Sequence, residues 1–151
     1  MKKTFFPILL AALFSAFTPA VPGKELAGYK LRYDQVFSLR DYNLWVITNE
    51  STFDHTFVAI DAAVPRPCFG NELVLAAKVE TENNSYHVTF KKAVVEKEVM
   101  QVYLAVDRRS EKLDNDSTVS LISWTRPKGL QKVNFYHGNL LVKSVPLVEV
   151  Y

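Results

Sequence analysis

The chain of 151 residues has 18 lysines and arginines against 16 aspartates and glutamates, and it contains one cysteine. Residues 1–20 hold two of the lysines and no acid, so residues 21–151 carry equal numbers of basic and acidic side chains. This neutral balance excludes the basic surface typical of nucleic-acid-binding proteins, and a single cysteine excludes an internal disulfide.

The first twenty residues have the pattern of a secretory signal peptide. They begin with two lysines after the initial Met, continue as an apolar run over residues 4–17 and end on small residues at Ala20. The apolar run is shorter than the roughly 20 residues that cross a bilayer, and Pro7 interrupts it. We expect cleavage near Ala20, with Ala16 as an alternative, and a secreted or periplasmic bacterial protein with no stable membrane anchor.

The remaining residues are predicted to form one domain after a short tether. Residues 21–28 include Pro22 and Gly23 and are mostly polar or small, which favours a flexible N-terminal tether. Residues 29–151 then make a single β-rich domain, because nothing repeats and no linker divides them. A chain of about 130 residues buries roughly two-thirds of its unfolded surface without disulfides.

Alternating apolar and polar residues predict strands along most of this domain. We expect a mainly β (α+β) fold, an antiparallel sandwich or open barrel of about seven or eight strands with one short helix packed on it. Residues 96–98 and 137–139 are expected at hairpin tips. The predicted strands cover residues 29–33, 44–48, 73–79, 86–91, 100–106, 119–125, 133–136 and 140–143, with residues 145–150 as a further candidate that Pro146 places near a sheet edge.

The one helix is predicted over residues 51–59. Asn49 or Ser51 can cap it by accepting a free backbone N–H, and Glu50 favours the positive end of the helix dipole. Phe53 and Phe57 lie one turn apart on one face, so they are expected to dock the helix on the sheet.

Three polar or proline-containing segments are predicted to be loops. Residues 61–70 and 126–129 contain prolines, which fix the backbone and lack an N–H for a sheet. Residues 108–117 have almost no apolar side chain to bury. Within the first loop, we expect Cys68 to be a small buried side chain, because Phe69 and a strand follow; a reactive thiol and an intermolecular disulfide are the alternatives.

The motifs that carry most enzyme chemistry are absent. The chain has no glycine-rich phosphate loop and no nucleophile elbow, so we predict no catalytic residue and no cofactor. The three histidines, His55, His87 and His137, are widely separated, and we predict no metal site. A hydrolase using Cys68 as its nucleophile with a histidine as base is an alternative that the sequence disfavours.

Aromatic side chains make up 13% of the chain, and most of them lie in or beside predicted strands. Such residues usually pack in a core or across strands. Tyr103 is the best exception because it lies on the polar face of its strand, and an exposed aromatic ring suits binding to protein or carbohydrate.

Residues 44–145 resemble the C-terminal domain of secreted bacterial protease-complex accessory subunits and related small inhibitor-like proteins. The residues that carry the resemblance are the pair Phe53 and Phe57, the segment Pro67-Cys68-Phe69 that leads into the strand after residue 72, and Arg126-Pro127 before a final hairpin. The chain departs from that family in having a shorter loop, and in having Cys68 where those proteins usually carry an acid. The resemblance implies a secreted binding module associated with proteases, and it transfers no catalytic residue.

We therefore predict an exported, non-enzymatic module that binds another envelope or secreted protein, with no nucleic-acid partner. Stiff loops lose little entropy on binding. The predicted partner-binding residues are Arg66, Pro67, Tyr103, Arg126 and Pro127. The alternative is a small-ligand or glycan-binding β domain with an aromatic-lined concavity between sheet and helix.

Overall fold

The computed structural model describes residues 22–32, 42–80, 84, 86–108 and 119–147. The predicted signal peptide and most of the predicted loop over residues 108–117 lie outside the described residues. Within the described part the chain is mainly β, with ten strands and one short helix. The elements are β1 (Gly23–Glu25), β2 (Tyr29–Leu31), β3 (Asn43–Ile47), α1 (Glu50–Thr56), β4 (Phe57–Ala59), β5 (Glu72–Lys78), β6 (Tyr86–Glu96), β7 (Val99–Arg108), β8 (Ser120–Thr125), β9 (Lys132–His137) and β10 (Leu140–Pro146).

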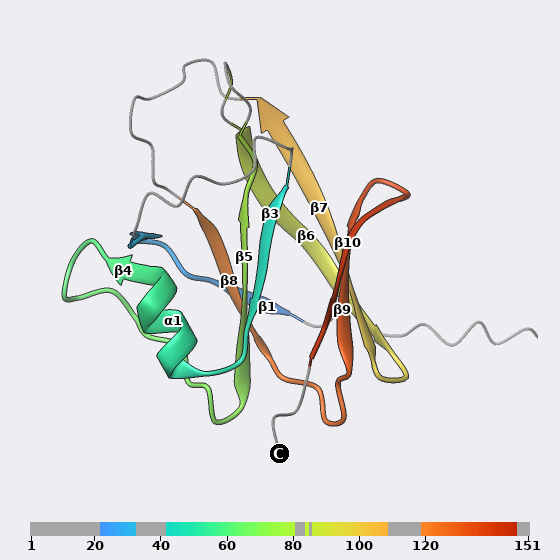
Figure 1. The fold of residues 1–151 in the computed structure, drawn as a ribbon, viewed down its shortest axis with the longest axis horizontal. Coiled ribbons are helices and arrows are strands. Elements are labelled where there is room, and N and C mark those ends of the chain that lie inside the picture. The colour runs from blue at the N-terminus through green and yellow to red at the C-terminus, as the bar shows by residue number, and fades with distance from the viewer. Residues whose placement is uncertain (1–21, 33–41, 81–83, 85, 109–118, 148–151) are drawn as a thin grey trace, which may run out of the picture.

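Two four-stranded sheets face each other (Figure 1). The first sheet has the order β1-β8-β5-β3 and the second has the order β10-β9-β7-β6, without closure into a barrel. The sandwich-like alternative of the predicted fold class is therefore the one observed. One pairing departs from the antiparallel prediction, because β7 and β9 run parallel, with Val99 opposite Lys132. After β7 the chain crosses to the first sheet, where it forms β8. It then returns to the second sheet as β9, which runs in the same direction as β7.

Helix α1 and the two-stranded β2–β4 sheet form a third layer on the outer face of the first sheet (Figure 1). This layer makes β5 a strand that is covered on both faces, and each of its residues from 73 to 77 is at most 1% exposed. A strand buried on both faces is typical of a continuous apolar run. The outer cluster consists of Leu26, Tyr29, Leu31, Ile47, Phe53, Phe57, Val74, Ala76 and Leu121.

The main core lies between the two sheets, where side chains from β5, β7, β8 and β9 meet. Its largest fully buried members include Leu73, Leu75, Met100 and Phe135.

The segment predicted as a flexible tether is part of the folded domain, which corrects that prediction for residues 22–28. Residues 23–25 pair with β8 as strand β1, and Leu26 is 4% exposed.

Gly23 explains how so short a strand stays in place. A Cβ atom on Gly23 would lie 2.5 Å from Ile122 Cδ1 and 2.5 Å from Trp124 Cε2. The glycine backbone therefore packs directly against the two side chains that face it across the strand pair, and any larger residue would have to displace them.

The helix ends earlier than predicted, at Thr56 rather than residue 59. Its start is as expected, because Thr52 N–H donates to Asn49 Oδ1 at 2.8 Å. Residues 57–59 instead form β4, which pairs with β2 from Leu31 opposite Phe57 to Tyr29 opposite Ala59. Tertiary pairing overrides the local helical pattern here, although both phenylalanines still face the core as predicted.

Both predicted hairpin tips are confirmed. Strands β6 and β7 join at Lys97, which has a φ of 57°, and β9 joins β10 at Gly138, which has a φ of 60°. The second position suits a glycine, since this left-handed conformation carries no Cβ penalty there.

Candidate functional site

Two of the predicted loops meet at one end of the first sheet. Glu72 at the start of β5 lies opposite Thr125 at the end of β8, so the chain before β5 and the chain after β8 are adjacent. The Arg126 N–H donates to the Asn71 carbonyl oxygen at 2.8 Å, which joins them directly. The β6–β7 turn lies at the same end, because the backbone N–H of Gln131 donates to the carbonyl oxygen of Glu98 at 2.8 Å. We call residues 61–71, 97–98 and 126–131 the loop end.

Arg66 holds the first of these loops against α1. Its Nη2 atom donates to Asp54 Oδ1 at 2.8 Å and to Glu50 Oε1 at 3.0 Å. The pKa of Arg66 is raised above its ordinary value, mainly by the hydrogen bond to Asp54 and secondly by the attraction of the Asp54 carboxylate. The guanidinium therefore stays charged. Exposed ion pairs contribute only about 0.2–1 kcal/mol each, so these contacts define the shape of the loop more than they stabilise the fold.

The two carboxylates that receive Arg66 were not identified as site residues from sequence. Their signal is visible afterwards, because Glu50 and Asp54 are four residues apart on one helix and therefore share a face. A cation in the following loop is the natural partner for such a pair. The consequence is that the Nη2 group of Arg66 is committed within the molecule, while the rest of the guanidinium is not.

Two further contacts hold the loop from its core side. The Tyr29 hydroxyl donates to the Pro65 carbonyl oxygen at 2.8 Å, and burial raises the pKa of this tyrosine. The Phe69 ring packs on the Phe53 ring with centroids 5.6 Å apart. The loop is thus attached both to α1 and to the outer cluster, which limits its conformational freedom.

The prediction that Cys68 is buried is wrong, since the side chain is exposed. Its backbone makes the turn into β5: the N–H donates to Glu72 Oε2 at 2.8 Å, and the carbonyl oxygen accepts the N–H of Glu72 at 2.9 Å. Phe69, one residue later, is the side chain that turns toward the core. Pro67 lies half-buried between Arg66 and this turn.

The second loop has a simpler attachment. Arg126 and Pro127 are half-buried, and Leu130, which is 5% exposed, anchors the loop to the main core. No ion pair joins the Arg126 side chain to any residue that the structure describes. Arg126 therefore differs from Arg66, because no acid among the described residues is paired with its charge.

Tyr103 does not belong to the loop end. It lies on the second sheet, where its ring stacks on Tyr136 of the neighbouring strand with centroids 5.2 Å apart and an interplanar angle of 19°. The Lys92 ammonium lies over the ring at 4.8 Å from its centroid. A neighbour on each side makes the half-buried Tyr103 part of a cross-strand row.

The predicted alternative of a Cys68 nucleophile paired with a histidine can be compared with the hydrogen bonds of the described residues. No hydrogen bond joins the Cys68 thiol to a histidine; His55 Nδ1 lies 2.7 Å from the Ser51 oxygen, and His137 contacts Tyr42. No group of three possible metal ligands occurs in the same described part. In the described residues, the helix α1 has seven residues, and no helix has the length and apolar character needed to cross a membrane.

Comparison with known proteins adds no assignment: no protein-family model, no curated protein and no solved structure matches the chain.

Proposed function

We propose that this protein is an exported, non-enzymatic module that binds another secreted or envelope protein through its loop end. The observation that carries the proposal is the backbone hydrogen bond between Arg126 and Asn71, which brings two proline-containing loops into one surface. Loops that are already held in place lose less conformational entropy on binding than mobile loops do.

Within this surface the two arginines have different roles. Arg126 is the candidate for direct contact, because its side chain has no ion pair in the described part of the chain. Arg66 acts as a positioning residue, since it holds the loop in shape through Glu50 and Asp54. Pro67 and Pro127 restrict the backbone on either side of the contact between the loops.

The finer proposal is that the partner is a protease or a subunit of a protease complex. It rests on the resemblance of residues 44–145 to the C-terminal domain of accessory subunits of such complexes. A glycan-binding role finds less support, because the aromatic residues between helix and sheet pack on one another. The Trp45 ring contacts Phe57 with centroids 6.1 Å apart, and Phe53 and Phe57 are 5.4 Å apart.

Affinity capture from an extract of the cell envelope tests the proposal. The immobilised protein is compared with Arg126→Ala, and with the control Arg108→Ala, which removes the same residue type at the end of β7. We expect Arg126→Ala to lose the partner and Arg108→Ala to retain it. Equal recovery by all three proteins contradicts the assignment of the loop end.

A second pair of variants separates shape from charge. Arg66→Lys keeps the positive charge but loses the paired hydrogen bonds to Glu50 and Asp54, and Arg66→Met loses both. If Arg66 positions the loop, the two variants weaken capture to a similar extent. Full recovery with Arg66→Lys alone indicates instead that the partner contacts the charge.

A further inference from the structure

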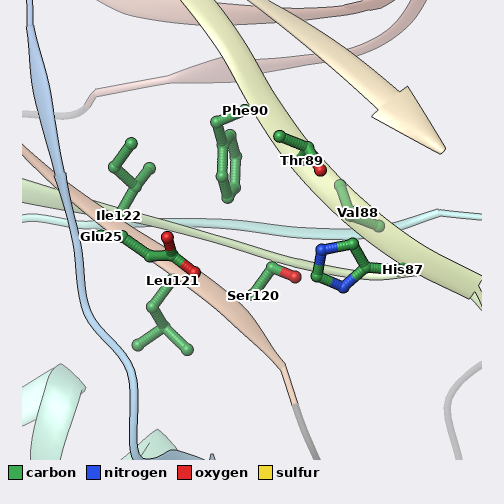
Figure 2. A pocket seen from close by; sticks show the side chains of 8 residues that line it. All are labelled: Glu25, His87, Val88, Thr89, Phe90, Ser120, Leu121 and Ile122. Atoms are coloured by element: carbon green, nitrogen blue, oxygen red, sulfur yellow. The ribbon is translucent and has the colours of Figure 1, made fainter. Parts of the chain in front are cut away.

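The two sides of the sandwich, where the edges of the sheets approach each other, are built differently. On the β3–β10 side, Lys143 Nζ donates to the Leu44 carbonyl oxygen at 2.8 Å and bridges the sheets. On the β1–β6 side, which we call the open side, a hollow of about 110 Å³ remains. It is lined by Glu25, His87, Val88, Thr89, Phe90, Ser120, Leu121 and Ile122 (Figure 2).

A second hollow of about 220 Å³ continues from the first and shares Glu25, His87 and Ser120 with it. The open side is therefore a groove rather than an isolated gap. It is also separate from the loop end, because Ser120 begins β8 and the loop end follows Thr125 at the other end of that strand.

Strand register explains why the polar groups of β1 and β8 lie here, while His87 is an exposed residue of the edge strand β6. Glu25 lies opposite Ile122, and side chains alternate along a strand, so Glu25, Ser120 and Ile122 all belong to the face toward the second sheet. From that second sheet, Phe90 completes the apolar part, with its ring held edge-on against Trp124 at 6.0 Å. Figure 2 shows the Glu25 carboxylate, the Ser120 hydroxyl and the His87 ring together along one side of the hollow.

These three polar groups have no partner in the described part of the chain. No hydrogen bond or ion pair there involves the Glu25 carboxylate, the Ser120 hydroxyl or the His87 ring. Among the described residues that line the groove, the one lysine or arginine is Lys78, whose ammonium lies 3.3 Å from a carboxylate oxygen of Glu80. Among the described residues, the exposed carboxylate of Glu25 therefore has no cation paired with it, and it lies beside the apolar side chains of the groove.

We propose that the open side binds a primary alkylammonium group, the chemistry of a lysine side chain or of a small free amine. An ammonium group has three donors, and Glu25, Ser120 and His87 supply three possible acceptors. Its methylene chain would lie along Phe90 and Ile122, as lysine stems do on apolar surfaces. The hollow has room for several water-sized groups, which accommodates a short alkyl chain.

The same residues do not form a catalytic triad. In the described part no hydrogen bond joins the Ser120 hydroxyl to His87, and none joins His87 to Glu25, so the hydroxyl has no activating base. The proposal is one of recognition alone, and it is independent of the protein partner assigned to the loop end.

Calorimetric and NMR titration of the purified protein tests the proposal. The probes are Nα-acetyl-lysine methylamide, its Nε-acetylated form and 1,5-diaminopentane. We expect saturable binding of the first probe with a dissociation constant on the order of 1 mM, and shifts in the amide signals of β1, β6 and β8. The Nε-acetylated probe should not bind, because it lacks the charge. If 1,5-diaminopentane also binds, the ammonium group that the groove recognises belongs to a small amine. If it does not bind, that ammonium group belongs to a lysine within a polypeptide.

Glu25→Gln is the decisive variant, and Glu96→Gln, an exposed carboxylate at the far end of β6, is its matched control. Loss of a charge-assisted hydrogen bond should weaken binding by about tenfold or more in Glu25→Gln and leave Glu96→Gln unchanged. Equal binding by both variants, or no saturable binding to the unmodified protein, overturns the proposal. So does self-association of Glu25→Gln without a change in amine binding, since it assigns Glu25 to protection of a sheet edge. Thermal unfolding of each variant confirms that it is folded.

Discussion

Replacement of Phe53 by alanine tests how the loop end is supported. Phe53 is 1% exposed, and its ring has three aromatic neighbours: Tyr29 at 5.1 Å, Phe57 at 5.4 Å and Phe69 at 5.6 Å between centroids. Phe→Ala changes in cores cost about 3–5 kcal/mol. Because rings surround this site and the helix cannot collapse without losing them, we expect Phe53→Ala to lower the free energy of unfolding by about 4 kcal/mol.

Urea unfolding followed by tryptophan fluorescence measures the loss. With an m-value of about 2 kcal/mol/M, the midpoint should fall by about 2 M while the slope stays the same. Phe53→Leu, which keeps most of the apolar volume but loses the ring contacts, should cost about 1–2 kcal/mol. Leu140→Ala is the control, because Leu140 is 66% exposed and its change should stay within about 0.5 kcal/mol. A loss below about 1 kcal/mol for Phe53→Ala refutes the view that this cluster docks the helix.

Three further substitutions give independent checks. Gly23→Val should release β1 from β8, with faster amide exchange across residues 23–26 and a stability loss of about 1–3 kcal/mol, because a Cβ would collide with Ile122. Tyr29→Phe should cost about 1 kcal/mol near neutral pH through loss of the hydrogen bond to Pro65. Since the pKa of Tyr29 is raised above its ordinary value of 10.0, that advantage is present below pH 10 and is lost as the pH rises through the raised pKa. The two proteins should therefore converge in denaturant midpoint above that range. Tyr103→Ala should lower stability by about 1 kcal/mol, measured by urea unfolding, without weakening partner capture, and a selective loss of capture would return this residue to the binding surface.

Much of the fold could be predicted from the sequence, because alternation and turn chemistry are local signals. The helix cap at Asn49, the inward-facing Phe53 and the hairpin tip at Gly138 all depend on neighbouring residues. The parallel pairing of β7 with β9 depends on the path of the chain through another sheet, which no local pattern encodes. The strand β1 was missed for a related reason, because its register is fixed by Trp124 about a hundred residues away.

The candidate site was predictable only in part. The stiffness of the two proline-containing loops is a local property, whereas their meeting through Arg126 and Asn71 follows from the pairing of β5 with β8. Cys68 was misplaced because the residue that turns into the core is Phe69, one position later. The groove on the open side was missed entirely, since Glu25 lies in a segment that the sequence predicted to be a tether.

Photo-crosslinking from two positions tests the central claim most directly. The single thiol, Cys68, is exposed within the loop end and accepts a benzophenone maleimide without any substitution. The control carries Cys68→Ser together with Asn139→Cys, which places the same probe at the opposite hairpin tip. We predict that the envelope partner crosslinks to the probe at Cys68, that unlabelled protein competes and that the Asn139 position gives no such product. Crosslinking of the same partner from Asn139 but not from Cys68 would contradict the account.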